Sequence, residues 1–181
     1  MTKLGREDWV EAADEELAEG GIDAVRVEVL ARRLGVTKGS FYWHFAGRDD
    51  LLDTVLARFE ALRTDAVIEQ VESVADEPVA RLRALTELVF SPSGSGDRGE
   101  PAIRAWASSD PRAAATLARV DRRRVRYVAD LLVAAGLERA VARRRSQLLY
   151  RTLIGDFVWR AHGGEPLDRA TRREVVSLLL P

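Results

Sequence analysis

Cysteine is absent from this 181-residue chain. Its absence excludes disulfide bonds, a zinc ribbon and a thiol nucleophile. Histidine is also scarce, because His44 and His162 are the only two. A histidine-based metal site would have to recruit several carboxylates, so we expect no metal and no cofactor.

Long apolar runs are missing too, and none approaches the roughly twenty residues that a membrane span requires. The first residues, MTKLGREDWVEAADEE, become acidic at once and contain no apolar stretch of a signal peptide. We therefore expect a soluble, cytoplasmic protein with no membrane partner. The apolar fraction of 46% is enough to build a hydrophobic core.

The net charge is only −1, but its distribution along the chain is uneven. Eight acidic residues and no basic one lie between Glu7 and Asp23, whereas five basic residues and one acidic residue lie between Arg26 and Arg48. A phosphate backbone responds to such a local field and not to the net charge of the chain. The second segment is compatible with a polyanionic partner, although solvated helix faces would give the same pattern.

Apolar residues recur at helical spacing along nearly the whole chain, and no segment alternates as a strand would. The spacing predicts an all-α protein of about nine helices, in which a three-helix N-terminal head precedes a larger helical body. The Ser/Gly/Pro stretch 91–101 predicts a loop. The helices are expected at about 6–19, 25–34, 37–43, 48–73, 78–89, 103–107, 110–136, 138–162 and 167–180.

The segment 25–45, VRVEVLARRLGVTKGSFYWHF, has the features of a helix-turn-helix. Ala31 is small enough for two helices to cross closely, and Gly35 supplies the left-handed residue of the turn. Thr37 is suited to begin the next helix as its N-cap. The apolar side chains expected to pack these two helices against the helix at 6–19 are those of Leu30, Leu34, Val36, Phe41 and Phe45.

With the two phenylalanines turned inward, the remaining side chains of this third helix face outward. An exposed cluster of Tyr42, Trp43 and His44 is costly in water, so a partner surface explains it better than folding does. Tyrosine and histidine can donate to phosphate oxygens, and tryptophan can rest on sugars or thymine methyl groups. Lys38 can bind a phosphate or a guanine edge, and Gly39 would let the backbone approach a groove.

The run LGVTKGSFYWHFAGRDDLL, residues 34–52, resembles the signature of the tetracycline-repressor (TetR) family. The resemblance covers the head, from about Arg6 to Phe59. It extends more loosely to residues 102–124 and 148–157, which resemble one branch of the family.

The resemblance implies a helix-turn-helix DNA-binding domain over residues 1–50 and a helical effector-binding and dimerisation domain over residues 51–181. It also implies a homodimer with recognition helices in successive major grooves, a four-helix dimer interface from the last two helices, and a small-molecule pocket in the body.

The DNA contacts of the family fall on ten residues of this chain: Arg26, Val27, Thr37, Lys38, Gly39, Ser40, Tyr42, Trp43, His44 and Arg48. Arg48 would add a phosphate contact at the positive end of the fourth helix. One departure concerns the start of the second helix, because the family usually carries Ser or Thr where Val25 and Arg26 stand here. Glu28 also occupies a position where a basic residue is frequent.

Two further sets of residues are expected in the body. The large apolar side chains expected around an effector, or else simply in the core, are Phe59, Leu62, Phe90, Trp106, Tyr127, Tyr150, Ile154 and Phe157. The residues expected at a dimer contact, or else in internal packing, are Leu148, Thr152, Gly155, Trp159, Val175 and Leu179. Asp156 and the arginine clusters 122–124 and 143–145 are expected to face solvent.

The preferred hypothesis is a transcriptional regulator, more often a repressor in this family, that binds a palindromic double-stranded DNA operator as a dimer and is released by a small-molecule effector. An enzyme is disfavoured, because no thiol, paired histidines, phosphate loop or carboxylate pair is found in a catalytic setting. The third hypothesis is a helical adaptor or ligand-binding protein without sequence-specific DNA binding, for which the unusual start of the second helix leaves room.

Overall fold

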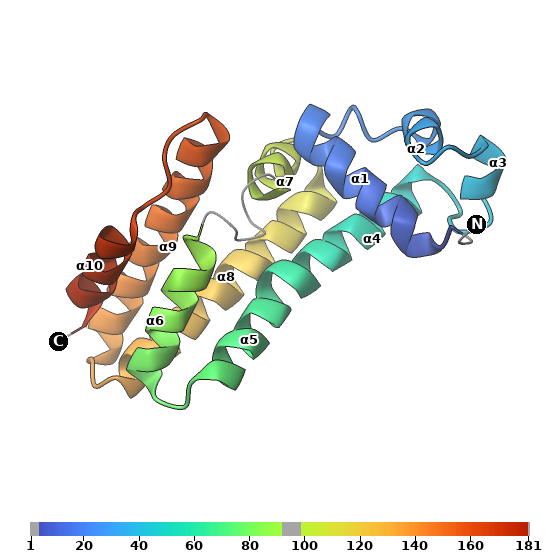
Figure 1. Cartoon of the computed structure of the whole chain (residues 1–181). Helices are drawn as coiled ribbons and strands as arrows, with labels where there is room; N and C mark the ends of the chain where they lie inside the picture. Colours follow the sequence, from blue (N-terminus) through green and yellow to red (C-terminus); the bar gives the residue numbers. More distant parts are fainter. Residues whose placement is uncertain (1–3, 92–98, 181) are drawn as a thin grey trace. The chain divides into compact units, whose positions relative to one another are not determined.

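The computed structural model describes residues 4–91 and 99–180, and the regular elements in these ranges are all helices (Figure 1). Their bounds are α1 (Arg6–Gly20), α2 (Val27–Arg33), α3 (Lys38–Phe41), α4 (Arg48–Glu60), η1 (Ala61–Asp65), α5 (Ala66–Val74), α6 (Pro78–Val89), α7 (Gly99–Ala107), α8 (Pro111–Ala134), α9 (Arg139–Ala161) and α10 (Arg169–Leu179). The π-helical segment η1 joins α4 to α5 without a break. Counting these three as one helix, the described residues form nine helices, which confirms the predicted class.

The chain folds as two compact units. Of the described residues, the first unit comprises 4–60 and 99–117, and the second comprises 61–91 and 118–180. The boundary at residue 60 coincides with the start of η1. The expected division into a DNA-binding domain over 1–50 and an effector-binding domain over 51–181 stays a prediction.

The segment before α8 differs in part from the expected loop and short helix. Residues 92–98, which make up most of the expected loop 91–101, lie outside the described residues. α7 begins at Gly99, four residues before the predicted start of this helix. Pro101 is accommodated because it lies in the first turn, where its missing N–H has no helical partner to lose.

The apolar face of α1 forms the centre of the first unit. Trp9, Val10, Ala13 and Leu17 are all buried, as their spacing predicts. α1 packs against α2, α4 and α7. This packing places the helix-turn-helix on a continuous apolar base.

The turn between α2 and α3 depends on Gly35. Its φ of 68° lies in the left-handed region, which costs other residue types about 1–2 kcal/mol. The Gly35 N–H donates to the Arg32 carbonyl at 3.2 Å, and the Val36 N–H donates to the Ala31 carbonyl at 2.9 Å. These two bonds end α2 in a Schellman motif and confirm the predicted role of the glycine.

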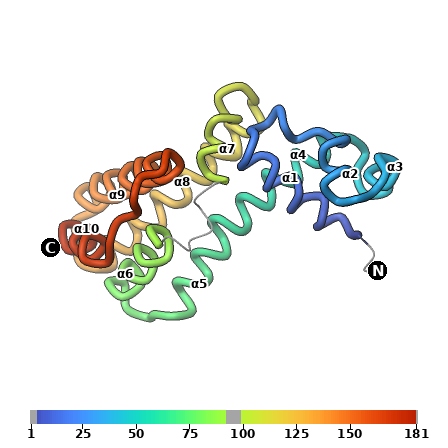
Figure 2. The backbone as a smooth tube through the Cα atoms, turned by 45° about the horizontal axis from the view of Figure 1, so that its top comes forward, coloured from blue at the N-terminus to red at the C-terminus, as the bar shows by residue number. Residues whose placement is uncertain are grey.

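The core of the second unit is built from α5, α6, α8, α9 and α10. Figures 1 and 2 both show α6, α9 and α10 side by side, and α10 packs on both of the others. Buried residues from all five helices meet in this core, among them Val71, Leu82, Leu132, Leu149 and Val176.

The start of α8 is fixed to α4 by a group of charged side chains. Asp110 caps α8, because its carboxylate accepts from the Arg112 N–H at 2.8 Å. The Arg112 guanidinium donates to Asp110 at 3.0 Å and also reaches Asp49 and Asp53 of α4, at 3.1 and 3.2 Å. The hydrogen bond from Arg112 lowers the pKa of Asp110 to about 2.

We expect the charge of Asp110 to contribute acid-sensitive stability to the first unit. Because its folded pKa lies below that of an unfolded aspartate, about 3.9, this contribution is complete above pH 4 and is lost as the pH falls towards 2. Asp110→Asn keeps a good N-cap but removes the charge. Its free energy of unfolding, measured in urea, should therefore fall less between pH 4 and pH 2 than that of the wild type. Asp110→Ala should also lose about 1 kcal/mol at neutral pH, because the cap is gone.

The matched control is Asp130→Asn, at an exposed position on the same helix. Equal acid sensitivity of the wild type and Asp110→Asn would contradict this role of Asp110.

Candidate nucleic-acid interface

α3 has only four residues and is too short to be stable by itself. Its orientation is set by aromatic contacts with α1. Phe41 is fully buried, and its ring meets that of Trp9 edge to face with the centroids 5.3 Å apart. Phe45, which is 2% exposed, stacks on Phe41 with the centroids 5.2 Å apart. The two rings therefore anchor the segment 38–45 at its middle and at its C-terminal end.

The other side of this segment faces solvent. Trp43 is 88% exposed and Tyr42 is 63% exposed, the two largest aromatic surfaces of the first unit. Lys38 and Gly39 are exposed as well, while Ser40 and His44 are half-buried at the rim. The predicted outward orientation of Tyr42 and Trp43 is confirmed, although α3 ends at Phe41 and the residues after it form a turn.

The N-terminal end of α3 leaves polar groups accessible. Thr37 has the extended backbone of an N-cap residue, with φ −80° and ψ 155°, as predicted. Its exposed side chain makes no capping hydrogen bond to the described backbone. The hydroxyl and the first N–H groups of the helix therefore remain accessible to an incoming anion.

Lys38 is paired with the unusual residue of α2. Its Nζ donates to a Glu28 carboxylate oxygen at 2.7 Å, and this hydrogen bond lowers the pKa of Glu28. Both side chains are more than half exposed, at 57% and 54%. Because such a solvated pair is weak, a phosphate can replace the carboxylate on the lysine.

The remaining residues predicted to contact DNA differ in accessibility. Arg26 is the exposed N-cap residue of α2, and Val27 behind it is half-buried. Arg48 is half-buried, and its guanidinium donates to the carbonyls of Val25 at 2.6 Å and Ile22 at 2.7 Å. These bonds use Nε and one terminal nitrogen, so Arg48 holds the segment before α2, and a phosphate contact from it stays a prediction.

Arg6 is a positioning residue whose role the sequence did not predict. It donates to the His44 carbonyl at 2.7 Å, to Asp50 at 3.1 Å and to the Thr54 hydroxyl at 2.7 Å. Its guanidinium also lies 4.2 Å from the centre of the Phe45 ring. It ties the end of the exposed segment to α4, a tertiary contact for which no local sequence signal exists.

The acidic run of α1 also has a structural role. Arg33 of α2 donates to Glu15 at 3.0 Å, Glu16 at 2.6 Å and Glu19 at 3.2 Å, and these bonds raise its pKa. The basic charge of the segment 26–48 is thus partly used inside the protein, and less of it faces a polyanion than the sequence suggests.

The eight residues predicted around an effector divide between the two units. Phe59 and Trp106 belong to the first unit, and Leu62 is 47% exposed. The other five lie in the second unit, where Phe90, Tyr150 and Phe157 belong to the buried core cluster and the partly buried Tyr127 and Ile154 pack against it. The place of all eight residues around an effector stays a prediction.

Several polar groups lie inside the second unit. The Tyr150 hydroxyl donates to Asp121 at 2.6 Å. The Tyr127 hydroxyl is buried with no hydrogen-bond partner among the described residues, and burial raises its pKa. Asp156 was predicted to face solvent, which is wrong, because it is buried and pairs with Arg160 at 2.8 Å.

The arginine clusters were also expected to be wholly solvated, and for two members this is wrong. Arg124 is half-buried and donates to the Arg63 carbonyl at 3.0 Å. Arg145 donates to the carbonyls of Leu179 and Leu180, at 2.8 and 2.7 Å, and so holds the end of α10.

The predicted dimer residues of α9 form an exposed stripe. Leu148 is 60% exposed and Trp159 is 65% exposed, and Thr152 and Gly155 between them also face solvent. A Cβ added at Gly155 would meet no atom within 4 Å. The two predicted dimer residues of α10, Val175 and Leu179, are less exposed than those of α9.

Leu179 is buried in the core of its own protomer, so its predicted place at a partner surface is corrected. Val175 is half-buried. Leu178, at 69% exposed, is the residue of this turn that α10 presents outward.

Neither a membrane span nor a metal site is found in the part of the chain that the structure describes. No helix there is long and apolar enough to cross a bilayer. No group of three or more His, Cys, Asp or Glu side chains within residues 4–91 and 99–180 is arranged to hold a metal ion.

Comparisons with known proteins agree with this geometry. The profile of the family described as "Bacterial regulatory proteins, tetR family" matches residues 10–55, which include α2, α3 and the turn between them. The class D tetracycline repressor protein of Escherichia coli is 37% identical over 65 residues, which are 36% of this chain and 30% of the repressor. The match to this relative therefore spans less than a third of the relative's length.

Two further similarities extend over nearly the whole chain. The HTH-type transcriptional regulator BetI of Burkholderia mallei is 25% identical over 173 residues, which cover 93% of this chain and 87% of BetI. The crystal structure of a TetR transcriptional regulator from Legionella pneumophila has the same fold, with a TM-score of 0.74 at 13% identity, covering 99% of this chain and 97% of that one. The helix-turn-helix and its profile match thus make residues 10–55 similar to the TetR family of bacterial regulatory proteins, and the whole chain shares the fold of a solved TetR regulator.

Proposed function

We propose that this protein is a DNA-binding transcriptional regulator that binds a palindromic operator as a dimer. The observation that carries the proposal is the exposure of Tyr42 and Trp43 on a segment whose neighbouring residues, Phe41 and Phe45, are buried. Large aromatic side chains held outward on a rigid base are typical of a surface that meets a partner. In a helix-turn-helix this surface enters the major groove.

The residues of the segment have complementary roles in this proposal. Tyr42 and His44 donate to phosphate oxygens, and Thr37 and Ser40 add hydroxyl contacts at the start of α3. Trp43 rests on sugars or on thymine methyl groups, and Lys38 binds a phosphate or a guanine edge. Gly39 carries no side chain, so the backbone can approach the groove closely.

Two copies are needed to read a palindrome, because the two half-sites are related by a twofold axis. The exposed stripe of α9, together with Leu178 of α10, supports a twofold contact between last helices. An effector bound in the second unit would release the operator if it bound better to the dimer conformation in which the heads do not fit the DNA. We propose that the protein represses transcription and that it acts in the cytoplasm.

Two other functions explain the structure less well. An enzyme would need a set of convergent reactive groups, and the exposed surface of the segment 38–45 offers none beyond Lys38 and His44. A helical adaptor would not need the buried Phe41 and Phe45 to hold Tyr42 and Trp43 in the orientation that suits a groove. Binding to no sequence in a selection from random duplexes would favour the adaptor.

We expect Tyr42→Ala and Lys38→Ala to weaken binding to a palindromic site from the gene's own upstream region. Each removes a phosphate or base contact, so the dissociation constant should rise about tenfold or more, as measured by fluorescence anisotropy. If Lys38 binds a phosphate, its removal should also reduce the slope of log affinity against log salt by about one.

The matched control is Arg122→Ala, which removes an exposed basic residue from α8. Because Tyr42 is exposed, Tyr42→Ala should change the free energy of unfolding by less than about 0.5 kcal/mol, which separates lost binding from lost folding. Unchanged DNA affinity in both variants would refute the proposal.

The pair between Glu28 and Lys38 should moderate the affinity for DNA. Glu28→Gln removes the carboxylate that competes with phosphate for the lysine and repels the duplex, so binding should tighten by about two- to tenfold at low salt. The gain should be smaller in the Lys38→Ala background, which a double-mutant cycle would measure. Weaker binding of Glu28→Gln would instead assign the carboxylate a favourable contact with a base.

The stripe of α9 should hold the dimer together. Leu148→Glu places a charge on this surface and should raise the dimer dissociation constant by more than tenfold, as measured by analytical ultracentrifugation. Arg143→Glu, at an exposed position elsewhere on α9, is the control and should leave the dimer intact. A monomeric wild type, or equal effects of both variants, would count against this interface.

A further inference from the structure

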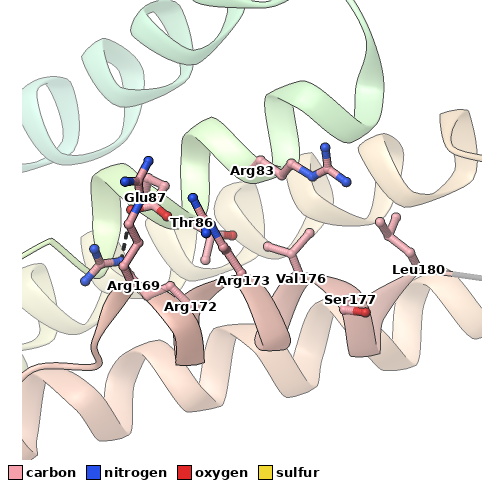
Figure 3. Close-up of a pocket in the computed structure, with 9 residues that line it drawn as sticks. All are labelled: Arg83, Thr86, Glu87, Arg169, Arg172, Arg173, Val176, Ser177 and Leu180. Carbon is pink, nitrogen blue, oxygen red and sulfur yellow. Dashed lines mark hydrogen bonds and ion pairs between the residues drawn. The ribbon is translucent and has the colours of Figure 1, made fainter.

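A cavity of about 590 Å³ lies between α6 and α10 in the second unit. This volume falls in the range of small-molecule sites, about 300–1,000 Å³. None of the eight residues that the sequence suggested for an effector pocket lines it. Figure 3 shows its lining, which consists of Arg83, Thr86, Glu87, Arg169, Arg172, Arg173, Val176, Ser177 and Leu180.

The charge of this lining is strongly one-sided. Four guanidinium groups face a single carboxylate, that of Glu87, so the lining carries a net charge of +3. Glu87 accepts from Arg172 at 3.0 Å, and Arg172 also donates to the Leu167 carbonyl at 2.6 Å. One arginine is therefore fixed by the protein, and the only acid of the lining is already paired.

The other three arginines are not neutralised in this way. Among residues 4–91 and 99–180, no side chain or carbonyl forms a hydrogen bond or ion pair with the guanidinium groups of Arg83, Arg169 and Arg173. They come from both walls, since the first lies on α6 and the other two lie on α10. Figure 3 shows the Arg83 side chain directed towards the Val176–Leu180 end of the lining and away from Arg169 and Arg173, so a ligand with two separated anionic groups would meet guanidinium groups at both ends.

The position of the arginines on α10 is unfavourable for the helix itself. Arg169, Arg172 and Arg173 lie within its first five residues, where the positive end of the helix dipole repels cations. Arg169 and Arg173 are also four residues apart, so their like charges lie on one face and repel each other. Asp168, the N-cap residue, offsets only part of this charge. Helix stability therefore does not explain the cluster, whereas a bound anion would.

We propose that this cavity binds a small molecule bearing two or more phosphate or carboxylate groups. The planar guanidinium group matches both anions with two parallel hydrogen bonds, and three available arginines suit more than one anionic group. The exposed Ser177 hydroxyl can add a polar contact, and the side chains of Val176 and Leu180 offer apolar surface for the rest of the molecule. The site is separate from the DNA interface, and its ligand binding can be measured without DNA.

The test is isothermal titration of the full chain with inorganic pyrophosphate and, in a second arm, with citrate, at constant ionic strength. We expect saturable binding of one anion per protomer, and the tighter of the two probes identifies phosphate or carboxylate as the preferred group. Arg169→Gln with Arg173→Gln should weaken that binding by about tenfold or more. Arg83→Gln, on the opposite wall, should weaken it independently.

The control is Arg122→Gln, which removes the same charge from an exposed position outside the cavity. Thermal unfolding without the anion checks that each variant folds, and removing like charges from α10 should not lower its melting temperature. The proposal is overturned if neither probe binds saturably, or if chloride at matched ionic strength gives the same binding isotherm. It is also overturned if Arg122→Gln weakens binding as much as the cavity variants do.

Discussion

The aromatic contact between α1 and the segment 38–45 determines what this protein can present to a partner. A helix of four residues has almost no stability of its own, so its direction comes from tertiary packing. Phe41 provides it by packing against Trp9, and Phe45 adds to it by stacking on Phe41, which leaves Tyr42 and Trp43 exposed. The exposure of two costly side chains is thus a direct result of burying two others.

Ion pairs change the charge of this surface but do not determine its shape. α1 carries a run of acids that would repel a duplex, but Arg33 turns several of them into contacts with α2. Glu28 holds Lys38 in a pair that water and salt weaken easily. The basic charge available to a phosphate backbone is therefore smaller than the composition of the segment suggests. Binding strength should then depend more on shape and on hydroxyl and aromatic contacts than on charge alone.

The sequence predicted those features that depend on local rules. Helical spacing identified the helices, Gly35 identified the turn, and alternation of buried and exposed aromatics identified the outer surface. Features that depend on distant residues were not predictable: the contacts of Arg6 with α4 join residues more than forty positions apart. The buried pair formed by Asp156 was missed because a charged residue in an apolar run looks solvated until its partner is seen. Leu179 was misplaced because neighbouring leucines share a helix but not a face.

The π-helical turn η1 absorbs one extra residue within the continuous helix that leads from α4 to α5. A π-turn is wider than an α-turn, so it contains the additional residue while the hydrogen bonding continues and the later side chains keep their directions. Deleting one residue there would restore regular α-geometry, and Val71 would still face the core. Deleting a residue between η1 and Val71 would instead turn every later side chain of α5 by about 100° about the helix axis and take Val71 out of the core. The helix can therefore lose one residue at η1 without a redesign of the face of α5.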